Sequence, residues 1–369
     1  MKIMHVGQMI GGLDVYIRNS ITHCPDDTME FVVVCGKGDK HEPVMRHGKA
    51  VREHRISLYR SLNPLRDGLG LLQVIYWVMR EKPDLIHCHS AKGGMLGRLA
   101  GWLTGTKTVY TPHAFSFLST PSHLKGKVFR WMEKWTRMRT YLLACSESER
   151  QMGIQEVGYR ESHALVWHNA VPDARWMAVP VKEVTPKAYA CYIGRPCYQK
   201  NTLFLADVIK KVKDRGCELE FLLLGVGYYS SDLDLLKEKI KDYDLTDTIT
   251  LKPWISHEEC LGYLQRATLY VTTSLYEGLP LSVIEAMSLG KAVVASDVVG
   301  NKDCVKDGIN GYLLPLDADR FAERVVALCE DEGLRKKMEK ASREIFESEF
   351  FLDTQIQRLH DIYTTLQTR

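Results

Sequence analysis

Residues 268–296 read TLYVTTSLYEGLPLSVIEAMSLGKAVVAS, and this stretch indicates the architecture of the chain. The β-branched and aromatic run at 268–273 predicts a strand. A loop with Gly278 and Pro280 follows, then a helix, and then a second apolar strand at 292–296. An apolar strand, a loop, a helix and another apolar strand form the repeating unit of a parallel sheet that is covered on both faces.

The same alternation runs through the whole chain and predicts twelve strands in two sets of six. This pattern favours two doubly wound α/β domains, because a closed β/α barrel needs eight strands. A proline-rich, charged segment at 172–188 reads as the linker. We expect one domain at 1–177, a second at 186–348, and a last segment at 349–369 within a helical stretch, 334–369. The predicted strands are 2–7, 31–36, 85–90, 107–113, 141–146, 164–168, 189–194, 219–225, 248–252, 268–273, 292–296 and 311–315.

Composition places the chain among soluble globular proteins. Its 369 residues are 45% apolar and 26% charged, and the length suggests two or three domains. Residues 1–180 carry 24 basic and 16 acidic side chains, a net of +8, and residues 181–369 carry 25 and 30, a net of −5. A basic front half and an acidic back half predict two domains with different partners.

Cysteine usage and the first residues favour a cytoplasmic protein. The ten cysteines include no Cys-x-x-Cys pair, and several lie in apolar strands, as buried reduced thiols do. The N-terminus lacks the apolar region and cleavage site of a signal peptide. The longest apolar run, 69–79, is far shorter than the ~20 residues of a membrane-spanning helix. We expect a soluble protein, or one that lies on a membrane surface.

Residues that follow strands in the second half are suited to an anionic ligand, because doubly wound sheets bind ligands at the carboxyl ends of their strands. Arg195 and Lys200 can both reach one diphosphate. The helix near Leu281 would add N–H groups and a favourable dipole. Glu277 and Glu285 are eight positions apart, so one can bind ribose hydroxyls and the other a sugar. Solvated cations, and glutamates placed for the helix dipole, are the alternatives.

Two places in the first half are also candidates. Gly11 and Gly12 follow the first strand, where glycines let a loop approach a ligand and point helix N–H groups at an anion. The loop is not G-x-G-x-x-G, and no acidic residue ends the second strand, so a nicotinamide cofactor is not expected. His113 ends a strand and is placed to contact a ligand. A tight turn and a core histidine are the alternatives.

The segment 125–142 is predicted to be a basic amphipathic helix with tryptophans. Such a helix suits an anionic membrane surface, and the alternative is an ordinary helix with a solvated basic face. One stripe holds Arg130, Lys134 and Arg137, the next holds Trp131, Trp135, Met138 and Leu142, and Lys125, Lys127 and Arg139 add charge.

These motifs resemble a known family. Glu277 to Glu285 resembles the E-x7-E signature of retaining GT-B glycosyltransferases. The text EGLPLSVIEAMSLGKAVVASDVVG, followed by VKDGINGYLLP, resembles bacterial family-4 glycosyltransferases, and GRPCYQKN resembles their donor-phosphate motif. SAKGGMLGRLA and TPHAFSF resemble the capsular and exopolysaccharide members. The similarity covers nearly the whole chain and implies two Rossmann-like domains facing a cleft.

The resemblance also implies roles for individual residues. The C-terminal domain would bind a nucleotide-diphosphate sugar and the N-terminal domain the acceptor, and the final helix would cross back onto the first domain. In catalysis and donor binding, Arg195 and Lys200 would hold the diphosphate, Glu285 the ribose and Glu277 the donor sugar. The backbone through Gly278, Leu279, Pro280 and Leu281 would meet sugar hydroxyls and phosphate, and His113 and the Gly11–Gly12 loop would close over the sugar.

Several positions depart from the family pattern. Ala114 and Asn201 stand where glycine is frequent, and Lys302-Asp303 replaces Pro-Glu. Trp254 follows Pro253 near the place of a glycine beside the base, and we expect it to stack on the nucleobase. The departures leave the reaction class unchanged but bear on which base and sugar are bound.

The sequence therefore predicts a retaining hexosyltransferase of cell-surface polysaccharide biosynthesis. The donor substrate would be a nucleotide sugar, with UDP expected, and the acceptor a glycan or a polyprenyl-diphosphate-linked sugar. No further cofactor and no bound metal are expected. We expect a cytoplasmic protein, peripheral on the inner face of the plasma membrane. The alternatives are a nucleotide-sugar 2-epimerase of the same fold and a non-catalytic binding protein; a nucleic-acid partner is not expected.

Overall fold

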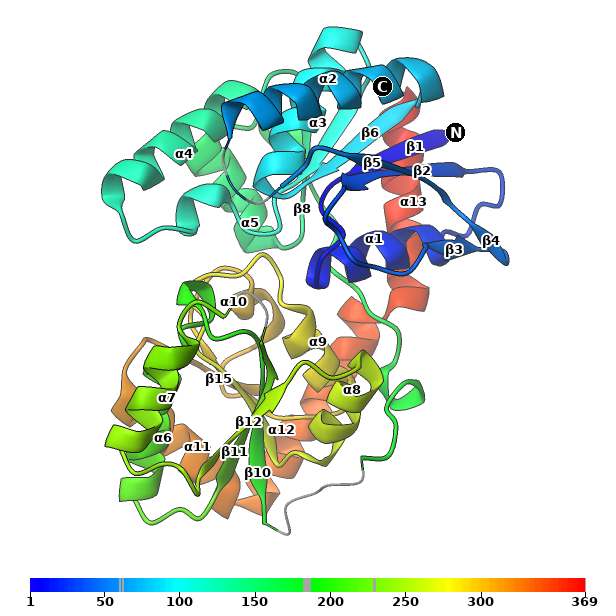
Figure 1. Cartoon of the computed structure of the whole chain (residues 1–369). Coiled ribbons are helices and arrows are strands. Elements are labelled where there is room, and N and C mark those ends of the chain that lie inside the picture. The colour runs from blue at the N-terminus through cyan, green and yellow to red at the C-terminus, as the bar shows by residue number, and fades with distance from the viewer. Residues whose placement is uncertain (60, 62, 182–186, 228–229, 369) are drawn as a thin grey trace. The chain divides into compact units, whose positions relative to one another are not determined.

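The computed structural model describes residues 1–368 except 60, 62, 182–186 and 228–229. The chain divides into two compact units, Met1–Ala170 with Leu352–Arg369, and Val171–Phe351. Each unit is built on one parallel sheet, as the sequence predicts for a doubly wound α/β protein (Figure 1). The first residues of the predicted linker lie in the second unit, and residues 182–186 of that linker lie outside the described residues.

The sheet of the first unit has seven strands in the order β5-β2-β1-β6-β7-β8-β9. Six are the apolar runs that the sequence predicts. The other, β5 (Arg52–Ile56), was missed because its sequence, REHRI, is charged; the strand pairs only with β2 at the sheet edge, where polar residues are tolerated. The rest are β1 (Lys2–Val6), β2 (Glu30–Gly36), β6 (Leu85–His89), β7 (Thr108–Thr111), β8 (Tyr141–Ala144) and β9 (Ala164–Val166), with a hairpin of β3 (Met45–Arg46) and β4 (Lys49–Ala50).

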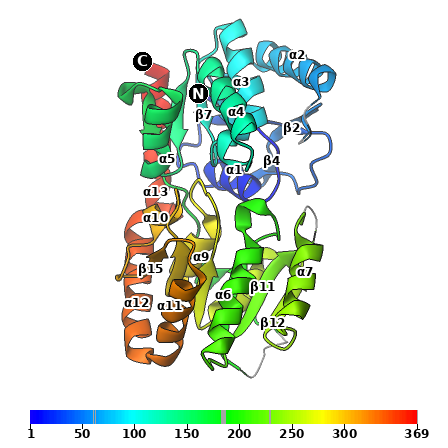
Figure 2. The same cartoon turned by 90° about the vertical axis from the view of Figure 1, so that its left-hand side faces the viewer.

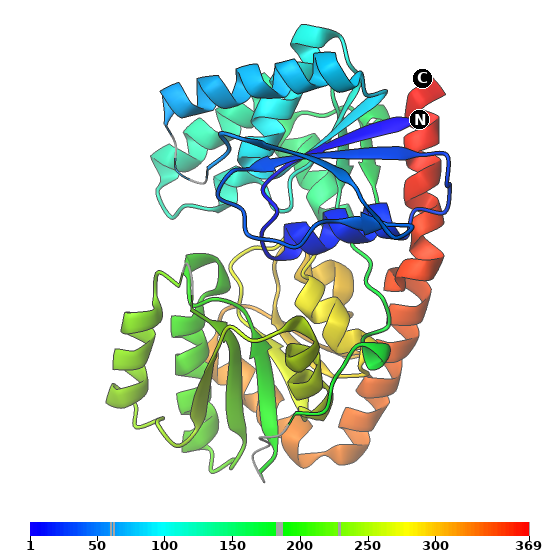
Figure 3. The same cartoon turned by 45° about the vertical axis from the view of Figure 1, so that its right-hand side comes forward.

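Helices cover both faces of this sheet (Figure 3), and successive side chains of each strand point to opposite faces. Met4 and Ile86 share one core with Val74 and Leu96, which belong to the helices on one face. His87 points to the other face, where the last helix of the chain lies. The first layer is α2 (Pro64–Glu81), α3 (Ser90–Thr104) and α4 (His123–Thr136), the second is α1 (Gly12–Thr22) and α13 (Leu352–Thr368), and α5 (Glu147–Met152), η1 (Ser116–Leu118), η2 (Gly153–Val157) and η3 (Glu161–His163) complete the unit.

The second unit has six parallel strands in the order β12-β11-β10-β13-β14-β15. All six match predicted strands, because this sheet is covered on both faces and its strands are apolar. The strands are β10 (Tyr189–Ile193), β11 (Glu220–Val226), β12 (Ile249–Pro253), β13 (Leu269–Thr272), β14 (Val293–Ser296) and β15 (Gly311–Leu314). The helices are α6 (Thr202–Asp214), α7 (Leu233–Asp242), α8 (His257–Arg266), α9 (Leu281–Ser288), α10 (Asn301–Cys304), α11 (Ala318–Glu330) and α12 (Glu332–Ile345), with η4 (Ala174–Trp176), η5 (Tyr198–Lys200) and η6 (Phe346–Phe350).

Two helix predictions were wrong in extent. The helix predicted over 125–142 ends at Thr136; Met138 has a positive φ of 43°, and Leu142 is a buried residue of β8. The apolar stripe therefore does not continue past Trp135. The helix predicted over 334–369 is interrupted at Phe351, which is extended and pairs with Val171. In both places tertiary contacts override a helical sequence pattern.

Candidate active site

The carboxyl end of the second sheet brings the predicted donor-binding residues together. The strand order reverses between β10 and β13, and doubly wound sheets bind ligands at such a switch point. The loops after these strands are joined by hydrogen bonds: the Leu275 N–H donates to the carbonyl of Gln199 at 2.8 Å, and the Thr273 hydroxyl donates to the carbonyl of Lys200 at 3.3 Å. The joined loops fix Lys200 beside the segment that carries Glu277.

Glu277 is nearly buried and is held by three side chains. Lys200 Nζ lies 2.6 Å from Glu277 Oε1, and the Ser274 hydroxyl donates to the same oxygen at 2.7 Å. Gln199 Nε2 donates to Oε2 at 3.2 Å. The Glu277 side chain is 8% exposed and that of Lys200 is 19% exposed, so this is a charge pair with restricted access to water. Sequence reasoning named Glu277 and Lys200 but not Gln199, Ser274 or the ion pair.

Glu285 has a basic partner that the sequence analysis missed. His257 Nε2 lies 2.8 Å from Glu285 Oε1. The hydrogen bond that His257 donates to Glu285 raises the pKa of His257, against the effect of burial. His257 begins α8, three residues after Trp254, and Trp254 is strongly exposed at the end of β12. The sequence could have indicated His257 as a polar residue shortly after a strand. Its partner could not be predicted, because Glu285 lies on another helix, far along the chain.

The other donor-site residues that were predicted in the second unit lie at the same end of its sheet, whereas Gly11 and Gly12 belong to the first unit. Arg195 follows β10 and is half-buried. Its positive charge acts on Tyr276 in the loop after β13: burial raises the pKa of Tyr276, and the charge of Arg195 opposes that rise. Gly278 and Leu279 lead into Pro280, the N-cap of α9, which offers no side-chain acceptor to the first N–H groups of the helix. An anion placed there would meet the positive end of the helix dipole.

Two departures from the family pattern adopt the backbone conformation that glycine favours. The φ angle is 50° at Asn201 and 81° at Ala114. Asparagine tolerates this region, whereas alanine in it is strained by roughly 1–2 kcal/mol. The requirement for a left-handed residue explains why glycine is frequent at both positions.

The carboxyl end of the first sheet also holds strained backbone. His113 has a φ of 53° directly before Ala114, so two successive residues other than glycine have a positive φ. Gly11, at the start of α1, has a φ of 59°, which glycine adopts without strain. Glu149, which is fully buried, holds the His113 loop: the Ala114 N–H donates to Oε1 at 2.7 Å and the Cys145 N–H to Oε2 at 2.8 Å. Strained residues fixed by their surroundings are typical of functional sites.

His113 is the outer member of a chain of three imidazoles. His5 Nδ1 lies 3.0 Å from His89 Nε2, and His89 Nδ1 lies 3.1 Å from His113 Nε2. His113 Nδ1 lies 3.4 Å from the Cys145 sulfur. Burial lowers the pKa of His5 and of His113 to about 3, so the imidazoles are neutral near pH 7. Both ring nitrogens of His113 are thus engaged within the first unit.

A second chain of hydrogen bonds joins the last helix to the sheet, and the donor and acceptor of each bond in it can be assigned. Thr111 donates its hydroxyl hydrogen to the carbonyl of Leu143 at 2.8 Å, so it accepts from His87 Nε2 at 2.8 Å. His87 Nδ1 must then accept from the Tyr363 hydroxyl of α13, at 2.7 Å. His87 and His89, which lie on the same strand, therefore belong to two separate chains of hydrogen bonds.

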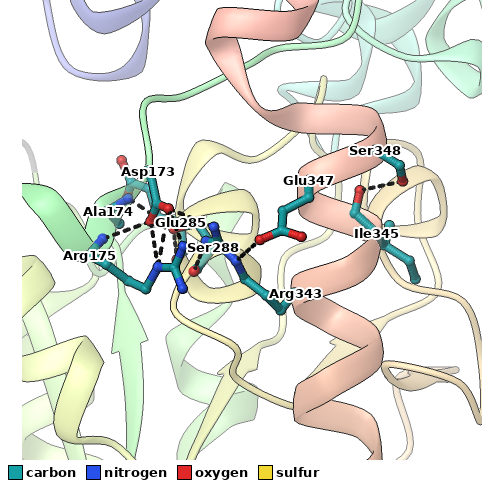
Figure 4. Close-up of polar contacts among 9 residues, drawn as sticks. All are labelled: Asp173, Ala174, Arg175, Glu285, Ser288, Arg343, Ile345, Glu347 and Ser348. Carbon is teal, nitrogen blue, oxygen red and sulfur yellow. Dashed lines mark hydrogen bonds and ion pairs between the residues drawn. The ribbon is translucent and has the colours of Figure 1, made fainter.

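The C-terminal end of α9 is anchored to the first residues of the second unit (Figure 4). Arg343 donates to Asp173 Oδ2 at 2.6 Å and to the carbonyl of Ser288, and the Ala174 N–H donates to the Ser288 hydroxyl at 3.3 Å. Burial would raise the pKa of Asp173, but hydrogen bonds from Arg175 and Arg343 outweigh it and hold the pKa at about 2. The anchor fixes the helix that carries Glu285.

The residues predicted to face a membrane lie on α4 or just after it. Trp131 and Trp135 are 63% and 56% exposed. Lys125, Lys127 and Lys134 are exposed, whereas Arg137 is half-buried and Arg130 pairs with Glu156 at 3.0 Å. Among the described residues, no helix combines the length and apolar character needed to span a bilayer.

Within the part of the chain that the structure describes, two clusters have the spacing of metal ligands, whereas no metal site was predicted from the sequence. One is His5, His87 and His89, and the other is Cys35, His41 and Glu53. Both ring nitrogens of His87 already hydrogen-bond to Tyr363 and Thr111, as described above. All ten cysteines carry free thiols. Metal independence therefore stays a prediction.

Comparison with known proteins agrees with this architecture. Residues 178–345 match the family model for glycosyl transferases group 1, and residues 10–175 match the model for glycosyltransferase family 4. A UDP-Gal:alpha-D-GlcNAc-diphosphoundecaprenol alpha-1,3-galactosyltransferase of Escherichia coli is 27% identical over 98% of this chain and 96% of its own length. The capsular polysaccharide biosynthesis glycosyltransferase CapM of Staphylococcus aureus is 23% identical over 85% and 84%.

Solved structures show the same fold. A sucrose-phosphate synthase of Thermosynechococcus elongatus superposes with a TM-score of 0.82 at 18% identity, over 99% of both chains. HepE of Anabaena, in complex with UDP and glucose, superposes with a TM-score of 0.79 at 18% identity, over 99% of this chain and 100% of its own. The two family models, the two parallel sheets and these neighbours agree: the chain belongs to the family-4 glycosyltransferases of the GT-B fold.

Proposed function

We propose that this glycosyltransferase moves a hexose from a UDP-sugar to a polyprenyl-diphosphate-linked glycan in cell-surface polysaccharide biosynthesis, with retention of anomeric configuration. The observation that carries the proposal is the charge pair of Lys200 and Glu277 at the switch point of the second sheet, 2.6 Å apart and beside the start of α9. The E. coli relative, whose name states a UDP-galactose donor and a diphosphoundecaprenol-linked acceptor, supports the substrate classes.

Charge stabilisation is the main contribution of the second unit to this reaction. Negative charge grows on the diphosphate as the sugar leaves, and Arg195, Lys200 and the first N–H groups of α9 are fixed groups of the right sign. Because these groups are held before the substrate arrives, little reorganisation opposes the reaction. Glu285 would bind the ribose and Trp254 the base, with the His257 ring holding Glu285 in place.

The environment of Glu277 supports a binding role rather than a nucleophilic one. Oε1 accepts from Lys200 and Ser274, and Oε2 accepts from Gln199, so neither oxygen is left without a donor. A carboxylate held in this way can accept from a sugar hydroxyl but is a poor nucleophile. We therefore favour front-side attack, in which the leaving phosphate accepts the proton of the acceptor hydroxyl. No metal or other cofactor is part of the proposal.

The exposed tryptophans and lysines of α4 support a peripheral location on the inner face of the plasma membrane, where a lipid-linked acceptor resides. The protein should then sediment with anionic vesicles and be released by salt, because exposed charges are screened at high ionic strength.

The test is an assay with UDP-glucose, UDP-galactose and UDP-N-acetylglucosamine and a polyprenyl-diphosphate-N-acetylglucosamine acceptor, with and without EDTA. We expect one donor to yield an α-linked product that forms equally well in EDTA. A β-linked product would contradict retention, and loss of activity in EDTA would contradict metal independence. Conversion of a UDP-sugar to its 2-epimer without any acceptor would establish the epimerase instead.

A further inference from the structure

Helix α2 exposes a continuous apolar stripe that the sequence analysis did not identify. Its members are Leu65, Leu69, Leu72, Tyr76 and Met79, spaced alternately by four and three residues, so they lie along one side of the helix. Their exposed fractions run from 49% to 87%. An exposed stripe of five apolar side chains, without a polar residue at any of its positions, is rare on the helix of a soluble protein and marks an interaction surface.

The buried side of α2 carries a charge where an apolar residue is usual. Glu81 is buried, and its carboxylate accepts from Arg52 and lies 2.9 Å from His54 Nε2. Glu81, the last residue of α2, thus joins Val74 and Val78 on the buried side of the helix. Helix α2 is therefore apolar on its outer side as well as on its inner side, whereas the outer side of an ordinary amphipathic helix is polar.

Helix α4 also buries a carboxylate and exposes apolar side chains. Glu133 is buried and accepts from Arg98 Nη2 at 2.9 Å and from the Tyr110 hydroxyl at 3.1 Å. Its outer side presents Leu124 and Val128 in addition to the two tryptophans. Because the carboxylate of α4 is held inside, the apolar side of the helix is held in water.

The two helices belong to one layer of the first unit. Helix α3 packs between α2 and α4 on the same face of the sheet (Figure 2). Its C-terminal turn adds the exposed side chains of Trp102 and Leu103. The stripe of α2, the end of α3 and the outer side of α4 are therefore presented by neighbouring elements.

The exposed charges on α2, α3 and α4 are all positive. The acidic residues of α2, α3 and α4 are Asp67, Glu81 and Glu133, and each is paired, Asp67 with Lys92 at 2.8 Å. The exposed charges on the three helices are basic: Arg66, Arg80, Lys125, Lys127 and Lys134. Apolar side chains among unopposed cations match an anionic lipid surface. In a symmetric contact between two copies, these cations would face each other.

We propose that the stripe of α2 is a membrane-contact surface that lies in the headgroup region of an anionic bilayer together with α4. The proposal extends the proposed function, which assigns a lipid-linked acceptor and places only the α4 segment at the membrane. Helix α2 would supply apolar insertion with little charge, and α4 the larger electrostatic attraction.

The test is co-sedimentation with vesicles of one part phosphatidylglycerol to two parts phosphatidylcholine. The variant Leu69→Gln/Leu72→Gln removes two members of the stripe and should bind about tenfold or more weakly, because each leucine loses part of its burial. The matched control is Leu235→Gln, an exposed leucine of α7 in the second unit, which should bind like the parent. Thermal unfolding and transfer to a water-soluble acceptor should be unchanged in both variants.

Several outcomes would overturn the proposal. If the α2 variant binds like the parent while Lys125→Gln/Lys127→Gln/Lys134→Gln loses binding, α2 is not a contact and the α4 assignment stands alone. If the parent itself does not bind vesicles, both membrane assignments fail, whereas glycosyl transfer is tested separately. If sedimentation velocity shows a dimer that the α2 variant dissociates, the stripe is an interface between copies.

Discussion

Replacement of Lys200 by methionine tests the donor site most directly. Methionine keeps the length and apolar stem of lysine but removes the charge that lies 2.6 Å from Glu277. If Lys200 stabilises the charge that develops on the leaving diphosphate, transfer should slow by ~10²–10³-fold, equivalent to about 2.7–4 kcal/mol of transition-state stabilisation. The rate is measured with the preferred UDP-sugar under saturating acceptor.

The same substitution has a structural effect that must be measured separately. Glu277 would keep hydrogen bonds from Ser274 and Gln199 but lose its only described cationic partner, at a cost of roughly 1–3 kcal/mol. For a unit of this size, 1 kcal/mol corresponds to about 2–4 °C in melting temperature. Adding Glu277→Gln removes the uncompensated carboxylate, so the double variant should recover stability but not activity.

Lys210→Met is the matched control for this experiment. Lys210 lies on α6 and forms an exposed ion pair with Asp214, which contributes little to stability. It should change neither the rate nor the melting temperature. A Lys200→Met enzyme that transfers sugar as fast as the parent would refute the role of Lys200, whatever its stability. An activity that returns together with stability in the double variant would show that Lys200 only offsets the charge of Glu277 and that neither charge is needed for transfer.

Three further predictions concern groups fixed by the fold. The pKa of His257 should lie above 6.5 and fall in Glu285→Gln; its ion pair stabilises the fold below pH 6.5, and this stabilisation is lost as the pH rises through the folded-state pKa. NMR titration measures it, and an unchanged pKa in the variant would contradict the pairing. Arg343→Met should lower the free energy of unfolding by roughly 1–3 kcal/mol and raise the pKa of Asp173 from about 2. Because the ionised carboxylate of Asp173 stabilises the fold above pH 3.8 and this stabilisation is lost as the pH falls, the variant should unfold at a higher pH than the parent during acid titration. Equal midpoints of acid unfolding in the two proteins would contradict the anchor. Ala114→Gly should raise the free energy of unfolding by about 0.5–1 kcal/mol because φ is 81°, and a loss of stability in denaturant titration would refute the strain.

Much of the fold was predictable because its signals are local. Apolar strands such as 31–36 are covered on both faces and so carry no polar residues, and the Gly-Pro loop at 278–280 sets the helix that follows. The edge strand β5 has the opposite character. Its side chains are polar because, at the edge of the sheet, only Ile56 is buried, so its own sequence does not distinguish it from a loop.

The candidate site was predictable residue by residue but not in its pairings. Position after a strand identified Arg195, Lys200, Glu277 and Glu285. The partner of each glutamate depends on which segments the strand order β12-β11-β10-β13 and the packing of the helices on it bring together, and these are properties of the whole unit. His257 was missed for this reason, since its partner lies on another helix.

The sequence by itself determined the parallel sheets, the two-domain organisation and the residue types at the strand ends, because these depend on hydrophobicity, backbone preference and charge within a few positions. Only the tertiary structure decided which charges are neutralised and which faces meet water. Glu81 and Glu133 look like solvent-facing residues in the sequence, yet both are buried, each beside an arginine. The leucines of α2 and the tryptophans of α4 are exposed because a helix that packs on a sheet buries only one of its sides, and the packing of the whole layer decides which side that is.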